Sequence, residues 1–130
     1  MVELFYFQPM PLTLKKKERL KSRKAIDALF QSGSSFSMFP FRVVYLFTTT
    51  GVQVGVGASK KNFKKAVDRN RVKRLTREAY RLQKEVLIHT LSEGKGLSIF
   101  FLYTAKEIIT YQEVQAAMGK ALTKLSTLKQ

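Results

Sequence analysis

Cysteine and tryptophan are absent from this 130-residue chain, and histidine occurs once. The lack of cysteine excludes disulfides, thiolate metal sites and a cysteine nucleophile. Acidic residues are also scarce, with nine aspartates and glutamates against 24 lysines and arginines, so the formal net charge is +15. No apolar run approaches the ~18 residues that a membrane-spanning helix needs. A chain with this charge is expected to bind nucleic acid or another polyanion.

The residues that could act in catalysis are few and widely separated. His89 stands alone near the end of a basic stretch, where a surface position is favoured over the role of a general base. The acidic residues share no close spacing that would gather them around a metal ion. The glycines around Gly55 and Gly57 lack the Gly-Lys-Ser/Thr ending of a phosphate-binding loop. The sequence therefore predicts no catalytic residue, no metal site and no cofactor bound by the protein alone.

Hydrophobic residues make up 45% of the chain, which is ordinary for a packed globule of one domain. We assign residues 13–130 to a single domain. Residues 1–12 are predicted to form a variable or partly disordered tail. They lack the basic start and small-residue cleavage site of a signal peptide, and Pro9 and Pro11 interrupt them.

Local patterns predict alternating helices and strands. Ser22 is expected to cap a helix that includes Leu29 and ends at Gly33. Thr110 and Glu113 have the spacing of a capping box that opens a last helix. The segments with β-branched and aromatic composition are 34–38, 41–49, 52–59 and 97–103. The order of helix, strands, helix, strand and helix indicates an α+β layer fold.

The most basic stretch is 60–84, where eleven of 25 residues are lysine or arginine and only two are acidic. We predict a helix from about Lys65 to about Thr90. Its buried stripe is expected to be Val72, Leu75, Ala79, Leu82 and Val86. Its other faces carry Arg69, Asn70, Arg71, Lys73, Arg74, Arg77 and Arg81. A merely solvated face is the alternative, but such faces usually intersperse acids for pairing, and unrelieved like charges repel one another. Guanidinium groups in fixed register therefore favour a polyanionic partner.

Two motifs within residues 59–84 resemble the bacterial ribonuclease P protein family. The first is Ser59-Lys60-Lys61 at the end of a predicted strand, and the second is AVDRNRVKRLTREAYR over residues 66–81. The resemblance extends from about Leu14 to about Leu125. It implies an αβββαβα two-layer sandwich with a four-stranded sheet, like the second domain of a small-subunit ribosomal protein. It also implies a left-handed βαβ crossover, which the residues alone would not indicate because the general rule is right-handed.

The resemblance further implies an accessory subunit of ribonuclease P, an endoribonuclease whose catalytic RNA removes the 5′ leader of precursor tRNA. The implied partners are that RNA and precursor tRNA, with Mg²⁺ expected in the RNA-containing holoenzyme. No membrane and no DNA partner are expected, and the location is expected to be cytoplasmic. Two other classes stay open, namely a ribosomal protein or ribosome-assembly factor and a self-contained nuclease.

The resemblance also assigns binding residues. The basic positions of the 65–90 helix would contact the RNA subunit or adjoining substrate. A leader cleft between the first helix and the sheet would be formed by Ile26, Phe30, Val43 and Tyr45, with Lys60 and Lys61 nearby. Ile26 stands where the family often has an aromatic residue. Further RNA contacts are expected from Lys15, Lys16, Lys17, Arg19, Lys64 and Lys65. Packing of Phe30 and Tyr45 in the core is the alternative to base stacking.

Overall fold

The computed structural model describes residues 16–91 and 94–128, so the predicted tail and Lys15 lie outside the described residues. The elements, in chain order, are the 3-10 helix η2 (Lys16–Glu18), α1 (Arg23–Ser32), β1 (Ser34–Met38), β2 (Phe41–Thr48), β3 (Val52–Ala58), α2 (Ala66–Gln83), α3 (Glu85–Ile88), β4 (Gly96–Tyr103) and α4 (Tyr111–Thr127). Apart from the short η2 and α3, this is the predicted αβββαβα order.

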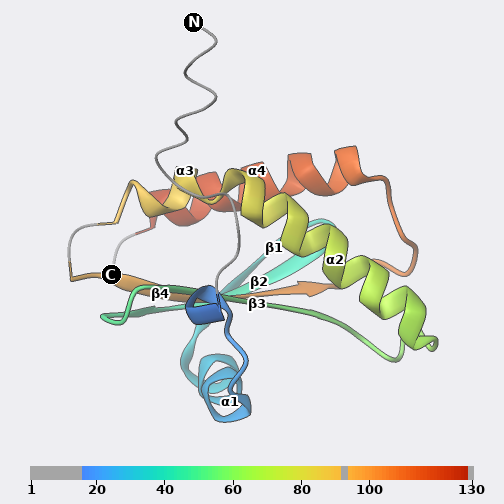
Figure 1. The fold of residues 1–130 in the computed structure, drawn as a ribbon, viewed down its shortest axis with the longest axis horizontal. Coiled ribbons are helices and arrows are strands. Elements are labelled where there is room, and N and C mark those ends of the chain that lie inside the picture. The colour runs from blue at the N-terminus through green and yellow to red at the C-terminus, as the bar shows by residue number, and fades with distance from the viewer. Residues whose placement is uncertain (1–15, 92–93, 129–130) are drawn as a thin grey trace, which may run out of the picture.

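The four strands form one mixed sheet in the order β1-β2-β4-β3 (Figure 1). β2 pairs antiparallel with both β1 and β4, whereas β3 and β4 are parallel. A parallel pair needs a crossover connection, and α2 and α3 provide it. β4 lies between two strands, which agrees with its nearly continuous apolar run.

The two faces of the sheet are covered by different helices. α2 and α4 lie over one face, and α1 lies against the other (Figure 1). The larger core cluster is on the α2 and α4 face, where Ile99 and Phe101 are fully buried. A smaller cluster, which includes Leu29 and Val44, lies between α1 and the opposite face. The predicted sandwich of sheet and helices is therefore present, and α1 covers part of the second sheet face.

The basic helix ends earlier than predicted. α2 stops at Gln83, and the four residues of α3 follow after Lys84. Lys84 is only 2% exposed, and its Nζ lies 2.9 Å from Oε2 of Glu18. The junction of the two helices is thus fixed by a charge pair with a segment 66 positions away in the sequence. Helical periodicity within residues 65–90 cannot reveal a partner so distant in the sequence, so the early end of α2 was not predicted.

The buried face of α2 is also rotated relative to the predicted stripe. Val72 and Ala79 are fully buried as predicted, but Leu82 is 40% and Val86 is 46% exposed. Thr76 is buried in their place, because its hydroxyl donates a hydrogen bond to the carbonyl of Val72 at 2.9 Å. The prediction was wrong for Leu82 and Val86 because it counted only apolar residues toward the core face.

Two buried tyrosines provide a matched test of polar groups in the core. Within the described residues the Tyr80 hydroxyl has no hydrogen-bond partner, whereas the Tyr103 hydroxyl donates to the Glu107 carbonyl at 2.7 Å and accepts from the Ile109 N–H at 3.0 Å. Tyr103→Phe should lower the free energy of unfolding by about 1–2 kcal/mol, because two backbone groups lose their partner. Tyr80→Phe should leave it unchanged or raise it by about 1 kcal/mol, because an unpaired buried hydroxyl carries a desolvation cost.

Urea unfolding of both variants measures the difference, provided that their m-values agree. A larger loss of stability in Tyr80→Phe than in Tyr103→Phe would contradict this assignment of the two hydroxyls.

Candidate nucleic-acid interface

The solvent side of α2 carries exposed basic residues at helical spacing. Asn70, Arg71 and Arg74 are exposed, and Lys73 is half-buried. Arg71 and Arg74 are three residues apart, so they are neighbours on one helix face. Neither forms an ion pair with another residue in the described part of the chain. Their planar guanidinium groups can therefore bind phosphate oxygens in pairs without first breaking an internal contact.

Arg69 has a role within the protein. Its Nη1 donates to the carbonyls of Phe63 and Lys64, each at 2.9 Å. These bonds hold the loop before α2 against the first turn of the helix, where the capping position Lys65 makes no side-chain cap bond. Arg69 thus positions the exposed Lys64 and Lys65 at the beginning of α2, a role that the basic pattern did not reveal.

Arg81 is paired with Glu78, one turn earlier on α2. The hydrogen bond to the guanidinium lowers the pKa of Glu78, and the same bond raises the pKa of Arg81. An RNA phosphate would have to compete with this carboxylate. Of the α2 arginines that were assigned to RNA, Arg81 therefore has the weakest geometric support.

The charges of two other arginines, Arg19 and Arg74, act on Arg77. Partial burial lowers the pKa of Arg77, and the positive charges of Arg19 and Arg74 lower it further. Arg19 reaches this place because its segment pairs with β3. The N–H of Leu20 donates to the carbonyl of Val54 at 2.9 Å, and Arg19 forms a parallel bridge with Val54. Sequence reasoning named Arg19 only as one of several additional basic residues.

The residues predicted to form the leader cleft do not share one surface. Val43 and Tyr45 point toward the α4 face, where Val43 is fully buried. The Tyr45 ring lies 6.0 Å from both the Phe36 and Phe47 rings, measured between centroids. Both residues therefore serve packing on that side of the sheet.

The α1 half of the predicted cleft lies on the opposite face. Ile26 and Leu46 both pack against the cluster that contains Val44. Val44 and Leu46 are the strand neighbours of Val43 and Tyr45 that point the other way. The prediction of one groove formed jointly by α1 and by Val43 and Tyr45 was wrong. The prediction failed because α1 covers the β2 side chains of Val44 and Leu46, which point to the opposite face from Val43 and Tyr45.

The α1 face has an aromatic pair of its own. Phe30 is 45% exposed, and its ring meets the Phe100 ring edge-on with centroids 5.2 Å apart. The Phe100 ring lies across Gly55 and Gly57, where a Cβ atom would come within 2.8 Å of ring carbons. Glycine at both positions therefore makes room for Phe100. An exposed ring fixed in this way can stack on a nucleic-acid base.

Arg42 shares the sheet face of this aromatic pair, and two lysines lie in the turn after β3. Arg42 is exposed on the same sheet face, and its Nη2 donates to the Ser35 hydroxyl at 3.1 Å. Lys60 and Lys61 are exposed in the turn that follows β3, where the Lys61 N–H donates to the Ser59 hydroxyl at 3.0 Å. The sequence analysis did not name Arg42 or Phe100 as binding residues. Each precedes or follows a buried phenylalanine on its strand, Phe41 or Phe101, and strand alternation therefore places it on the opposite face. The remaining predicted contacts Lys16 and Lys17 are exposed in η2.

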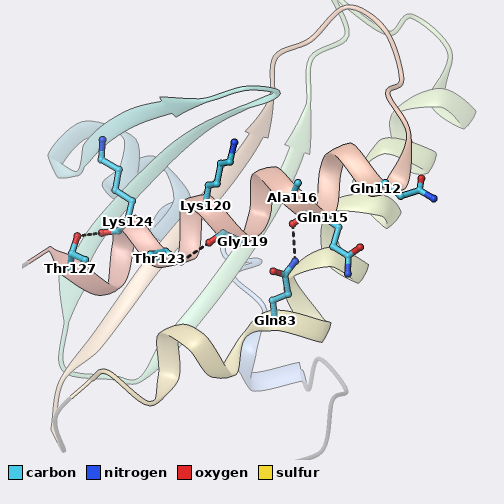
Figure 2. A pocket seen from close by; sticks show the side chains of 9 residues that line it. All are labelled: Gln83, Gln112, Gln115, Ala116, Gly119, Lys120, Thr123, Lys124 and Thr127. Carbon is cyan, nitrogen blue, oxygen red and sulfur yellow. Dashed lines mark hydrogen bonds between the residues drawn. The ribbon is translucent and has the colours of Figure 1, made fainter.

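A separate, open hollow of about 690 Å³ lies between the end of α2 and α4 (Figure 2). The Gln83 amide donates to the Gln115 carbonyl at 3.0 Å across it. Its sides consist of amide, hydroxyl and small side chains with Lys120 and Lys124, and they include no carboxylate or histidine. The hollow thus has fewer cationic groups than the α2 surface. Over residues 16–91 and 94–128, no three metal-ligating side chains gather at one place.

None of the helices that the structure describes is both long and apolar enough to span a membrane.

Comparison with known proteins agrees with the sequence motifs. The family model for Ribonuclease P matches residues 14–126. The ribonuclease P protein component of Porphyromonas gingivalis is 38% identical over 123 residues, which are 91% of this chain and 90% of that relative.

Solved structures show the same α+β fold. The RNase P protein of Staphylococcus aureus has a TM-score of 0.64 and 22% identity, covering 85% of this chain and 95% of that one. The RNase P protein of Thermotoga maritima has a TM-score of 0.65 and 23% identity, covering 82% of this chain and 96% of that one. The family model and the close curated relative together establish that the chain belongs to the ribonuclease P protein component family.

Proposed function

We propose that this chain binds the catalytic RNA of ribonuclease P and the 5′ leader of precursor tRNA, and so assists removal of the leader. The observation that carries the proposal is the exposed face of α2, on which Arg71 and Arg74 are neighbours without an internal ion pair. Membership of the ribonuclease P protein component family implies that the partner is an RNA. Guanidinium groups bind phosphates bidentately, and the release of counterions from RNA makes such binding depend strongly on salt.

In this proposal the catalytic groups belong to the RNA subunit, and Mg²⁺ acts there. The chain contributes binding energy, orientation and a positive field that offsets RNA repulsion. Such a subunit needs no general base or metal ligand of its own. Because its partners are the catalytic RNA and tRNA precursors, we place the chain in the cytoplasm.

We place the leader along the α1 face of the sheet rather than along Val43 and Tyr45. The exposed Phe30 ring, braced by Phe100, offers a stacking surface for an unpaired base. The exposed Arg42 on the same face can meet phosphates on either side of that base. An extended single strand suits this combination of one stacked base and flanking cations.

The proposal is tested by measuring cleavage of precursor tRNA in Mg²⁺. The reactions contain the transcribed catalytic RNA alone, the purified chain alone, or both together. We expect the chain to raise kcat/KM for leader removal and to produce no cleavage without the catalytic RNA. His89→Ala, at an exposed position after α3, should not change the rate.

Two results would favour the other classes. Cleavage by the chain alone, sensitive to His89→Ala, would indicate a self-contained nuclease. Stable co-sedimentation with ribosomal subunits, without any effect on leader removal, would indicate a ribosomal or ribosome-assembly protein.

A further inference from the structure

A buried ion pair joins the N-terminal segment to the end of α2. Lys84 Nζ lies 2.9 and 3.2 Å from the two carboxylate oxygens of Glu18. The Lys84 side chain is 3% exposed and that of Glu18 is 17% exposed. Removing two charges from water costs several kcal/mol per ion and often cancels the attraction between them. A pair of this kind therefore contributes more to the position of the segments it joins than to net stability.

The segment that Glu18 anchors is also held by β3. The Gln53 amide donates to the carbonyl of Lys17 at 3.3 Å, and the N–H of Leu20 donates to the carbonyl of Val54 at 2.9 Å. The backbone on both sides of Glu18 is thus fixed along one edge of the sheet. The ion pair adds the third attachment, to the helix that passes over that edge.

These attachments hold Arg19 on β3, directly after the residue that binds the C-terminal end of α2. Arg77 precedes Lys84 by seven residues, which is two helical turns, so both lie on the same face of the helix. Arg74 is one turn further along that face. The lowered pKa of Arg77, caused first by partial burial and then by the charges of Arg19 and Arg74, agrees with this proximity.

The charge of this cluster is not balanced by nearby acids in the described part of the chain. Glu18 is bound to Lys84, and Glu78 is bound to Arg81. None of Arg19, Arg74 and Arg77 forms an ion pair there. Three guanidinium groups from two distant segments repel one another until an anion binds among them.

We propose that Arg19, Arg74 and Arg77 form one phosphate-binding site for an RNA backbone, and that Glu18 is its positioning residue. The inference rests on the proposed RNA-binding function and deepens it, because it assigns the α2 surface a contribution from the N-terminal segment. Glu18 holds Arg19 in the site by binding Lys84. An acidic residue thereby increases the affinity of the chain for an anion.

The test compares two variants that raise the net charge equally. Glu18→Gln removes the carboxylate that anchors Arg19, and Glu78→Gln removes a carboxylate from a half-buried pair on α2. Filter binding of the full chain to transcribed catalytic RNA is measured over a range of KCl concentrations. Charge alone predicts tighter binding in both variants, whereas positioning predicts opposite effects.

We expect Glu18→Gln to weaken binding by roughly tenfold, the loss expected for one charged hydrogen bond. We also expect it to reduce the salt slope by about one. Glu78→Gln should bind as tightly as the wild type or more tightly. Arg19→Gln should reproduce the loss, and combining it with Glu18→Gln should add little, because both changes remove the same contact. Equal binding by Glu18→Gln and Glu78→Gln, or full additivity with Arg19→Gln, would overturn the proposal.

A second measurement covers the case in which Glu18→Gln does not fold. Arg19→Gln and Arg77→Gln are then combined in a double-mutant cycle on RNA binding. Residues that share one phosphate should give non-additive losses, and strictly additive losses would refute a shared site.

The same titrations with poly(U) separate this site from the proposed function. Failure of the wild-type chain to accelerate leader removal would refute the function. Loss of poly(U) binding in Arg19→Gln and Glu18→Gln but not in Glu78→Gln would still support the site, and equal binding by all three variants would overturn it.

Discussion

Arg71→Ala and Arg74→Ala should each weaken binding of the catalytic RNA by about 1–3 kcal/mol, and the double variant should lose more than either. Both side chains are exposed on α2, one turn apart, without an ion pair among the described residues. A contact to phosphate would also lower the salt slope by about one for each arginine. RNA binding measured over a range of KCl concentrations gives both quantities. Urea unfolding should remain unchanged, because neither residue contributes to the core.

Arg81→Ala and Leu87→Ala are the matched controls. Arg81 is already engaged by Glu78, so its loss should change RNA binding by less than about 1 kcal/mol, the range of an exposed ion pair. Leu87 is fully buried, so its truncation should lower the free energy of unfolding by about 2–5 kcal/mol without changing the salt slope. If Arg71→Ala or Arg74→Ala unfolds the chain while Leu87→Ala does not, the faces of this helical region have been assigned wrongly.

Local features of the fold were predictable from the sequence. The capping box at Thr110 is present, since its hydroxyl accepts from the Glu113 N–H at 3.2 Å. Ser22 caps α1 through the Ala25 N–H, and the N–H of Gly33 at the other end donates to the carbonyl of Leu29 at 2.7 Å. Each of these signals lies within four residues of the chain. Residue propensity and local spacing are therefore sufficient to predict these helix ends.

The side of the sheet that a helix covers could not be predicted in the same way. Alternation divides β2 into two sets, but Val43 and Tyr45 on one side are as apolar as Val44 and Leu46 on the other. Nothing in that pattern identifies the set that faces α1. The predicted leader cleft therefore combined residues from opposite faces of the sheet.

The sequence also gives no sign of which charged residues are buried. Lys84 is one of many basic residues in its stretch, and only its pairing with Glu18 distinguishes it. That partner lies 66 positions earlier and reaches α2 only because its segment pairs with β3. The proximity of Arg19 to Arg77 depends on the same tertiary contact. Long-range pairing, rather than residue type, decides which basic residues are buried and which are free to meet RNA.

The relocated leader site leads to a second large effect. Phe30→Ala should weaken binding of precursor tRNA with a leader by about 1–3 kcal/mol, the value of one stacked base. Binding of mature tRNA should not change, because it has no leader. The melting temperature should change little, since the Phe30 ring is 45% exposed. Affinities for the two RNAs, measured with the catalytic RNA present, give the comparison directly.

Tyr45→Ala and Phe39→Ala separate stacking from packing. Tyr45 is half-buried between Phe36 and Phe47, so its truncation should cost about 2–4 kcal/mol of stability, somewhat less than a fully buried aromatic, and affect both RNAs alike. Phe39 is 70% exposed in the turn between β1 and β2 rather than on α1, so Phe39→Ala should change neither affinity. A leader-specific defect in Tyr45→Ala with unchanged stability would return the leader to the α4 face. Equal defects in Phe30→Ala and Phe39→Ala would show that exposed aromatic area, rather than the braced ring of Phe30, attracts the single strand.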